Sequence, residues 1–257
     1  MSQGPLIRFE GLHKAFGKKR IYEGLDLQVE KGETLTVIGG SGTGKSVLLK
    51  CLIGLQAPDG GRVVFDGQDL TGLGEEGFLP IRRRVAMVFQ GAALFDSLTV
   101  GENIAYPLRE HDRALSGEEL AAKVKRKLEL VNLPGIEDMR PSDLSGGMRK
   151  RVGLARAIAT DPEVILWDEP TTGLDPISTR VIDDLIVSMK QKLGCTSIVV
   201  THDMDSAFRV SDRMAMLHGR RIVQVGTVTQ MQQSQREEVR AFFDARRTDV
   251  RREVPRQ

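Results

Sequence analysis

The sequence has 257 residues, enough for one large α/β domain, or for one domain with a subdomain and a tail. Hydrophobic residues make up 40% of the chain and charged residues 28%, which is typical of a globular protein with a sizeable core. The net charge of +2 argues against a surface dominated by nucleic-acid-binding charge.

Two further features bear on the environment of the chain. Cys51 and Cys195 lie far apart among apolar residues, and we expect both to be reduced and buried rather than joined in a disulfide or bound to a metal. No apolar run is long enough to cross a bilayer, and residues 1–11 show no signal-peptide pattern. We therefore expect any membrane role to come through a partner.

In chain order, the first predicted elements flank a glycine-rich turn. Apolar and polar residues alternate over residues 25–29, which predicts a half-buried strand. A buried strand is expected at residues 33–39 and a helix at residues 45–55. Between them, residues 39–46 (GGSGTGKS) fit the P-loop pattern G-x-x-x-x-G-K-[ST], in the strand–turn–helix context that the motif requires.

The P-loop predicts a phosphate site. Its glycines let backbone N–H groups turn inward around phosphate oxygens, and the N-terminus of the helix adds a favourable dipole. Lys45 should reach the β- and γ-phosphates of a nucleotide, and Ser46 should coordinate Mg²⁺. The nucleotide-binding residues expected here are Gly39, Gly40, Ser41, Gly42, Thr43, Gly44, Lys45, Ser46 and Val47.

The middle of the chain changes character. Strands are expected at residues 62–65 and 85–89, and apolar residues then recur at helical intervals. Ser116 and Glu119 have the capping-box spacing that marks the start of a helix. We therefore expect a helical insertion within the α/β core over residues 91–161.

Beyond the insertion, a strand at residues 164–167, a helix at 178–192 and a strand at 196–201 predict a mainly parallel sheet covered on both faces. Asp168 and Glu169 follow the first of these strands, at the end where open α/β sheets place ligands. Two acidic residues would also suit an ordinary turn, but the P-loop favours a nucleotide site. Asp168 would then hold Mg²⁺ through water, and Glu169 would act as general base on the attacking water.

A third motif, DLSGGMRKR at residues 143–151, resembles the LSGGQ signature of ABC transporters. It stands in the family's order with the P-loop, Gln90, the pair Asp168 and Glu169, Asp175 in TTGLD and His202 in VVTHD. By this resemblance the chain is identified as an ABC-transporter nucleotide-binding domain from about residue 6 to 230. The resemblance implies a P-loop NTPase (RecA-like) α/β core with a mainly parallel sheet, an antiparallel β edge and an inserted ABC helical subdomain.

The resemblance also implies domain limits. Residues 1–232 would form the nucleotide-binding domain, with its RecA-like core at 1–90 and 162–232 and its helical subdomain at 91–161, and residues 233–257 would form a C-terminal extension. In the extension, Val239, Phe242 and Phe243 share one helical face. This face should dock either on its own domain or on a second chain or accessory subunit.

The family pattern further implies the roles of individual residues. Ser145, Gly146 and Gly147 would face the γ-phosphate held by the opposite subunit, so that two chains sandwich two ATP molecules. Gln90 would contact the metal and the attacking water, and His202 would contact the γ-phosphate. The implied catalytic residues are Glu169, His202, Gln90 and Lys45, and the implied metal ligands are Ser46, Gln90 and Asp168.

Three positions complete the expected site. Phe16, in KAFG, stands where the family stacks an aromatic ring on adenine, although an aromatic there could also pack the core. Asp175 would belong to the nucleotide site. Met148 departs from the family, in which glutamine is usual, but Ser145 and both glycines are kept, so phosphate contact should survive.

A narrower resemblance concerns the cargo. LSGGM, together with residues 91–111, is similar to the MlaF-like ATPases of bacterial MCE-type phospholipid transporters. The resemblance implies ATP and Mg²⁺ as cofactors, and a place at the cytoplasmic face of the inner membrane. The implied partners are a second copy of the chain, an MlaE-like permease and an MlaD-like MCE-domain protein, with a small regulatory subunit as a further option and no nucleic acid. Leu94, Phe95 and Leu98 would receive a coupling helix of the permease, or would only pack the subdomain core.

Other functions stay open at this point. The same catalytic motifs would serve an importer for amino acids or other small solutes. A non-transport ABC ATPase of DNA repair or translation would need a long coiled-coil insertion or a second ATPase domain, for which the chain has no room. A non-catalytic interaction module is disfavoured because Lys45, Asp168, Glu169 and His202 are all retained.

Overall fold

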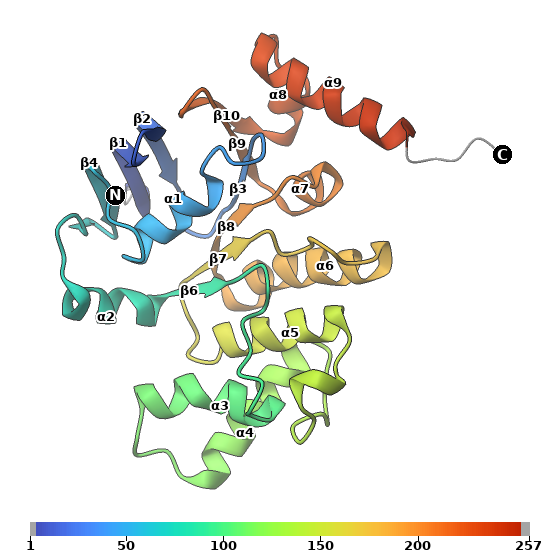
Figure 1. The fold of residues 1–257 in the computed structure, drawn as a ribbon. Coiled ribbons are helices and arrows are strands. Elements are labelled where there is room, and N and C mark those ends of the chain that lie inside the picture. The colour runs from blue at the N-terminus through green and yellow to red at the C-terminus, as the bar shows by residue number, and fades with distance from the viewer. Residues whose placement is uncertain (1–3, 253–257) are drawn as a thin grey trace. The chain divides into compact units, whose positions relative to one another are not determined.

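The computed structural model describes residues 4–252, with side chains up to residue 245. The chain divides into two compact units, one containing residues 1–78 and 198–257 and the other residues 79–197. Figure 1 traces the helices and strands of both units in chain order by colour.

The first unit contains an antiparallel sheet with the strand order β2-β1-β4-β5. Its strands are β1 (Ile7–Phe16), β2 (Lys19–Val29), β4 (Gly60–Phe65) and β5 (Gln68–Asp69). β2 contains the predicted strand 25–29, whereas β1 was not predicted, because an irregularity around Gly11, at φ 56°, breaks its alternation. This sheet is the expected antiparallel β edge.

Four strands of a second sheet are described with this unit, in the order β10-β9-β3-β8. Its strands are β3 (Thr34–Ile38), β8 (Thr196–Val200), β9 (Arg213–His218) and β10 (Arg221–Thr227). β3 runs parallel to β9, and β10 returns antiparallel to β9. All residues of β3 and β8 are buried, as expected for strands covered on both faces.

Helices α1 (Lys45–Leu52), α7 (Met204–Val210) and α8 (Val228–Gln232) complete the core of the first unit. α1 was predicted to reach Leu55, and that end is wrong. Gly54 adopts the left-handed conformation at φ 72°, and the N–H of Leu55 turns back to the carbonyl of Lys50 at 2.9 Å. This is a Schellman termination, in which glycine ends the helix although apolar residues continue past it.

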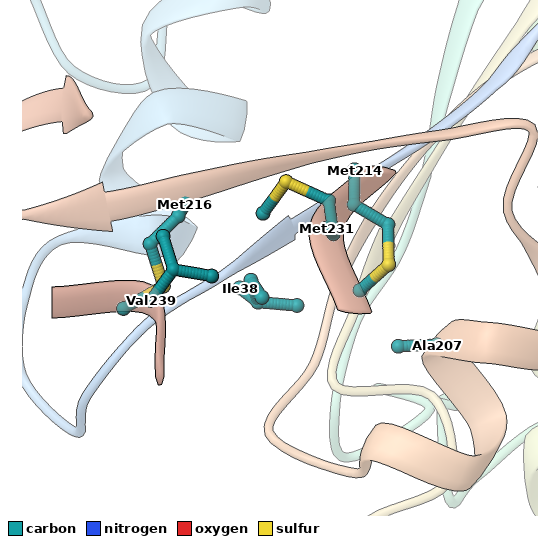
Figure 2. Close-up of a cluster of buried hydrophobic side chains, with 6 residues drawn as sticks. All are labelled: Ile38, Ala207, Met214, Met216, Met231 and Val239. Atoms are coloured by element: carbon teal, nitrogen blue, oxygen red, sulfur yellow. The ribbon is translucent and has the colours of Figure 1, made fainter. Parts of the chain in front are cut away.

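The C-terminal helix α9 (Glu237–Arg252) docks on its own unit. Figure 2 shows Val239 among apolar side chains of β3, α7, β9 and α8 in a buried cluster made of Ile38, Ala207, Met214, Met216, Met231 and Val239. Phe242 and Phe243 pack against this cluster, and the ring of Phe243 lies 5.7 Å from that of Phe208. Of the two expectations for the extension, docking on its own domain is the one that the structure shows.

The second unit contains the parallel strands β6 (Val85–Val88) and β7 (Val164–Asp168), with α2 (Glu75–Arg84) leading into β6. Between these strands lie α3 (Val100–His111), α4 (Gly117–Leu130), a 3-10 turn at Pro141–Asp143 and α5 (Gly146–Ala157), and α6 (Pro176–Leu193) follows β7. α3 contacts α4 and α5, and α5 contacts β6 and α6.

Two local predictions are confirmed. Ser116 caps α4 in a capping box: its hydroxyl accepts the N–H of Glu119 at 3.2 Å, and the Glu119 carboxylate accepts the N–H of Ser116 at 2.9 Å. Cys51 and Cys195 are free thiols and both are buried. Burial raises the pKa of the Cys51 thiol to about 11, which suits a structural rather than a reactive cysteine.

Candidate functional site

The P-loop closes on itself around the side chain of Lys45. This residue is 7% exposed, and its ammonium donates to the carbonyl oxygens of Gly39 and Gly40 at 3.1 Å each. The hydroxyl of Thr43 donates to the Gly40 carbonyl at 2.9 Å. A Cβ at Gly39 would lie 2.4 Å from the carbonyl oxygen of Leu217, so only glycine fits where β3 enters the loop.

The start of α1 depends on a residue that the motif does not contain. Gly44 is the N-cap, at φ 107°, and a Cβ there would lie 2.3 Å from Ile21. The buried hydroxyl of Tyr22 donates to the Gly44 carbonyl at 2.5 Å. Burial raises the pKa of Tyr22, so its proton stays in place for this bond. Only the tertiary fold brings β2 to the P-loop, so the motif gave no signal for Tyr22.

Phe16, at the end of β1, does not pack the core. Its side chain is 44% exposed, and the ammonium of Lys14 lies 5.3 Å from its ring centroid. Asp59 holds this strand end, because its carboxylate accepts bonds from Lys14 at 2.9 Å and from the N–H of Ala15 at 2.6 Å. The ring is therefore accessible, as a stacking role requires.

His202 also belongs to the first unit. It lies just beyond the end of β8 and is exposed. Asp203 follows it as the N-cap of α7, where its carboxylate accepts the N–H of Ser206 at 3.2 Å. The cap fixes the backbone immediately after His202.

In the second unit, β7 delivers the two carboxylates. Asp168 is its last residue and is 7% exposed. Glu169 follows at φ 50°, an unusual conformation for a residue other than glycine. The hydroxyl of Thr172 donates to the Glu169 carboxylate at 3.1 Å, and the N–H of Thr172 donates to the Glu169 carbonyl at 3.3 Å. The turn thus aims and holds the Glu169 side chain.

Asp175 acts as the N-cap of α6. Its carboxylate accepts the N–H groups of Ile177 and Ser178 at 3.0 Å each and the Ser178 hydroxyl at 2.6 Å. The hydrogen bonds from Ser178 lower the pKa of Asp175. The structure therefore gives this residue a capping role that the family pattern did not indicate.

Gln90 lies just after β6 and is exposed, at the start of an unusual turn. Ala92 and Ala93 follow with φ values of 60° and 51°. Arg156 of α5 donates to their carbonyl oxygens at 3.0 and 2.8 Å. A Cβ at Gly153 would lie 3.1 Å from Ala92, so α5 and this turn are closely packed.

The signature motif forms the N-terminus of α5. Ser145 is the N-cap, and its hydroxyl accepts the N–H of Met148 at 3.2 Å. Met148 therefore contributes through its backbone, which explains why the cap survives the change from glutamine. A glutamine at this third helical position could also have reached back to the N-cap N–H, and methionine cannot.

Comparisons with known proteins extend this picture. A family model described as ABC transporter matches residues 22–172. The mkl protein of Mycobacterium leprae, a probable ribonucleotide transport ATP-binding protein, is 41% identical over 96% of this chain and 71% of its own length. MlaF of Haemophilus influenzae, the ATP-binding protein of an intermembrane phospholipid transport system, is 42% identical over 90% of this chain and 87% of its own length. The methionine import protein MetN of Rhizobium johnstonii is 40% identical over 87% of this chain and 61% of its own length.

Solved structures agree with the fold. The ATP-binding cassette MJ0796, a dimer bound to ADP and Pi, matches with a TM-score of 0.80 and 30% identity over 86% of this chain and 98% of that one. CbiO1 of Clostridium perfringens, part of the transporter complex cbiONQ, matches with a TM-score of 0.82 and 26% identity over 96% of this chain and 97% of that one.

The fold and its motifs define a P-loop ATPase with an antiparallel β subdomain. The chain belongs to the ABC transporter family. It is the ATP-binding subunit of a transporter, and it couples ATP hydrolysis to transport. In the part of the chain that the structure describes, no helix combines the length and apolar character needed to span a bilayer.

Proposed function

We propose that this chain works as a dimer beneath a membrane permease and powers phospholipid movement between the inner and outer membranes of a bacterial envelope. The observation that carries the cargo assignment is the 42% identity to MlaF of H. influenzae, over 87% of that protein. The chain would act at the cytoplasmic face of the inner membrane, with an MlaE-like permease and an MlaD-like MCE-domain protein as partners.

Nucleotide binding would use the P-loop as it stands. The two carbonyl oxygens that hold the Lys45 ammonium keep it at the loop, so little reorganisation is needed when phosphate oxygens take over as acceptors. The left-handed glycines turn the N–H groups of the loop toward the phosphates. Phe16, as an exposed ring, would stack on adenine.

Ser46, Gln90 and Asp168 would hold Mg²⁺. Their hydroxyl, amide and carboxylate oxygens are the hard donors that this ion prefers. Mg²⁺ would supply charge neutralisation on the phosphates.

Hydrolysis would depend on Glu169 and His202. Glu169 would accept the proton of the attacking water, and Thr172 would keep the carboxylate aimed through its 3.1 Å hydrogen bond. His202 would donate to the γ-phosphate, and Gln90 would orient the water.

The dimer would complete each site. Ser145, Gly146 and Gly147 lie at a helix N-terminus, which provides N–H donors and a favourable dipole for a phosphate group. We assign this phosphate to the nucleotide of the second chain, as in an ATP sandwich. The solved structure of MJ0796, a dimer bound to ADP and Pi, supports the proposal of a dimer.

Coupling to the permease would use the segment after Gln90. Phe95 and Tyr106 are 44% and 48% exposed, and their rings lie 5.1 Å apart. The buried amide of Asn103 holds the Phe95 backbone from both sides, accepting its N–H at 2.8 Å and donating to its carbonyl at 3.1 Å. Exposed rings on a rigid backbone suit the docking of an apolar permease helix.

The alternative is an importer, as the 40% identity to a methionine import protein indicates. Extraction of the native complex in mild detergent separates the two functions. Phospholipid transport predicts that a permease and an MCE-domain protein copurify, and that deletion of the gene leaves excess phospholipid in the outer leaflet of the outer membrane. Intact lipid asymmetry with lost uptake of a small solute would support the importer instead.

A further inference from the structure

Lys150, on α5, reaches across to the loop that follows Glu169. Its ammonium donates to the carbonyl oxygens of Pro170 and Thr172 at 2.8 and 2.7 Å. The side chain is half-buried. A charged donor in this setting forms strong hydrogen bonds, because little water competes for them.

The loop needs such support. Glu169 has a positive φ of 50°, and the N–H of Thr172 closes the turn on the Glu169 carbonyl at 3.3 Å. A residue other than glycine keeps a left-handed conformation only when its surroundings hold it there. Lys150 fixes the carbonyls of both Pro170 and Thr172, and Thr172 in turn binds the Glu169 carboxylate.

The charge of Glu169 also acts on Lys150. Burial lowers the pKa of Lys150, while the nearby negative charge of Glu169 raises it. The negative charge of Glu169 therefore favours the charged form of the Lys150 ammonium.

The other end of α5 is the signature motif. Ser145 caps this helix, and a Cβ at Gly147 would lie 3.0 Å from the hydroxyl of Ser178 on α6. The signature end, Lys150 and the Glu169 loop are thus packed as one piece of the second unit.

We infer that Lys150 is a positioning residue, which ties the loop of the general base Glu169 to the signature helix. This inference rests on the proposed roles of Glu169 and Ser145. Ser145 would contact the nucleotide of the second chain, whereas Glu169 would act on the nucleotide of its own chain. Lys150 would therefore transmit the binding of one ATP at the signature motif to the general base of the other ATP site.

The test compares ATP hydrolysis by the full chain and by Lys150→Met at saturating Mg²⁺. Displacing a catalytic group by a small distance costs on the order of 10- to 100-fold in rate, so kcat should fall by about that factor while KM for ATP changes less than about twofold. Lys150→Arg, which keeps a charged donor, should recover most of the rate. Arg84→Met is the matched control, since it also removes one positive charge and the hydrogen bonds to Glu163 at 2.7 and 2.9 Å, and it should leave kcat unchanged.

The results distinguish a failure of the role inferred for Lys150 from a failure of the role proposed for Glu169. A kcat of Lys150→Met within about twofold of the parent, or an equal loss in Arg84→Met, overturns the inference. Glu169→Gln is measured in parallel: if it hydrolyses ATP normally, the proposed base itself is wrong. If Glu169→Gln is inactive and the kcat of Lys150→Met stays within about twofold of the parent, only the inference fails. Should the methionine variant not fold, Lys150→Ala, which also removes the donor, is judged by the same limits.

Discussion

At the scale of single residues, the site combines side chains from recognisable motifs with others that hold them. Lys45, Asp168 and Glu169 could be proposed from the sequence because the chemistry expected of them depends on a fixed local pattern, and their roles stay predictions. Tyr22 and Arg156 could not, because each bonds to backbone carbonyls that only the tertiary fold brings near.

Replacement of Glu169 by glutamine keeps the shape of the side chain and removes its ability to accept a proton. Because a positioned general base contributes about 10²–10⁴-fold, phosphate release should slow by that factor while ATP still binds. Phosphate release at a near-normal rate, with nucleotide binding verified by equilibrium titration, would show that another group takes the proton.

Tyr22→Phe removes only the hydroxyl that donates to Gly44. The Gly44 carbonyl still accepts the N–H of Val47 at 2.8 Å, so the loss should be that of one net hydrogen bond, about 1 kcal/mol of unfolding free energy. Urea denaturation measures this difference. A variant as stable as the parent would mean that the bond contributes nothing to the start of α1.

At the scale of elements, segments that adjoin a recognised motif or a helix cap were predicted well. The buried strands before the P-loop and before Asp168, and the capped helix after Ser116, all appear where the pattern indicated. β9 and β10 were not predicted, because β9 (RMAMLH) contains no β-branched or aromatic residue and neither strand adjoins a recognised motif. Here tertiary packing, rather than local pattern, decides the strand.

The C-terminal helix shows the same limit. The shared face of Val239, Phe242 and Phe243 predicted a helix that docks, but not its partner. The partner is a methionine-rich surface contributed by β9 and α8, which no local pattern connects to α9.

Val239→Ala should therefore destabilise the protein. Val239 is fully buried, and removing two methyl groups from a packed site costs about 1–3 kcal/mol. Chemical denaturation gives the value, and Arg240→Ala, at the exposed neighbouring position on α9, should be nearly neutral. Equal effects of the two substitutions would contradict the docked position of the helix.

At the scale of the whole molecule, the account depends on a second chain. The P-loop and His202 lie in the first unit, whereas Gln90, Asp168, Glu169 and the signature motif lie in the second. The sequence and the single chain leave the signature without an assigned phosphate, and the proposed sandwich dimer supplies one.

Mixing two inactive variants tests this dimer most directly. Ser145→Arg blocks the signature and Lys45→Ala removes a charge from the phosphate site, so each should be inactive alone. A mixed dimer holds one intact composite site and one site that is broken twice. The account predicts that the mixture regains ATP hydrolysis. Crosslinking shows whether mixed dimers have formed. If they have formed and the mixture is no more active than either variant alone, the result contradicts the proposal that the signature acts on the nucleotide of the other chain and that one intact site is sufficient for hydrolysis.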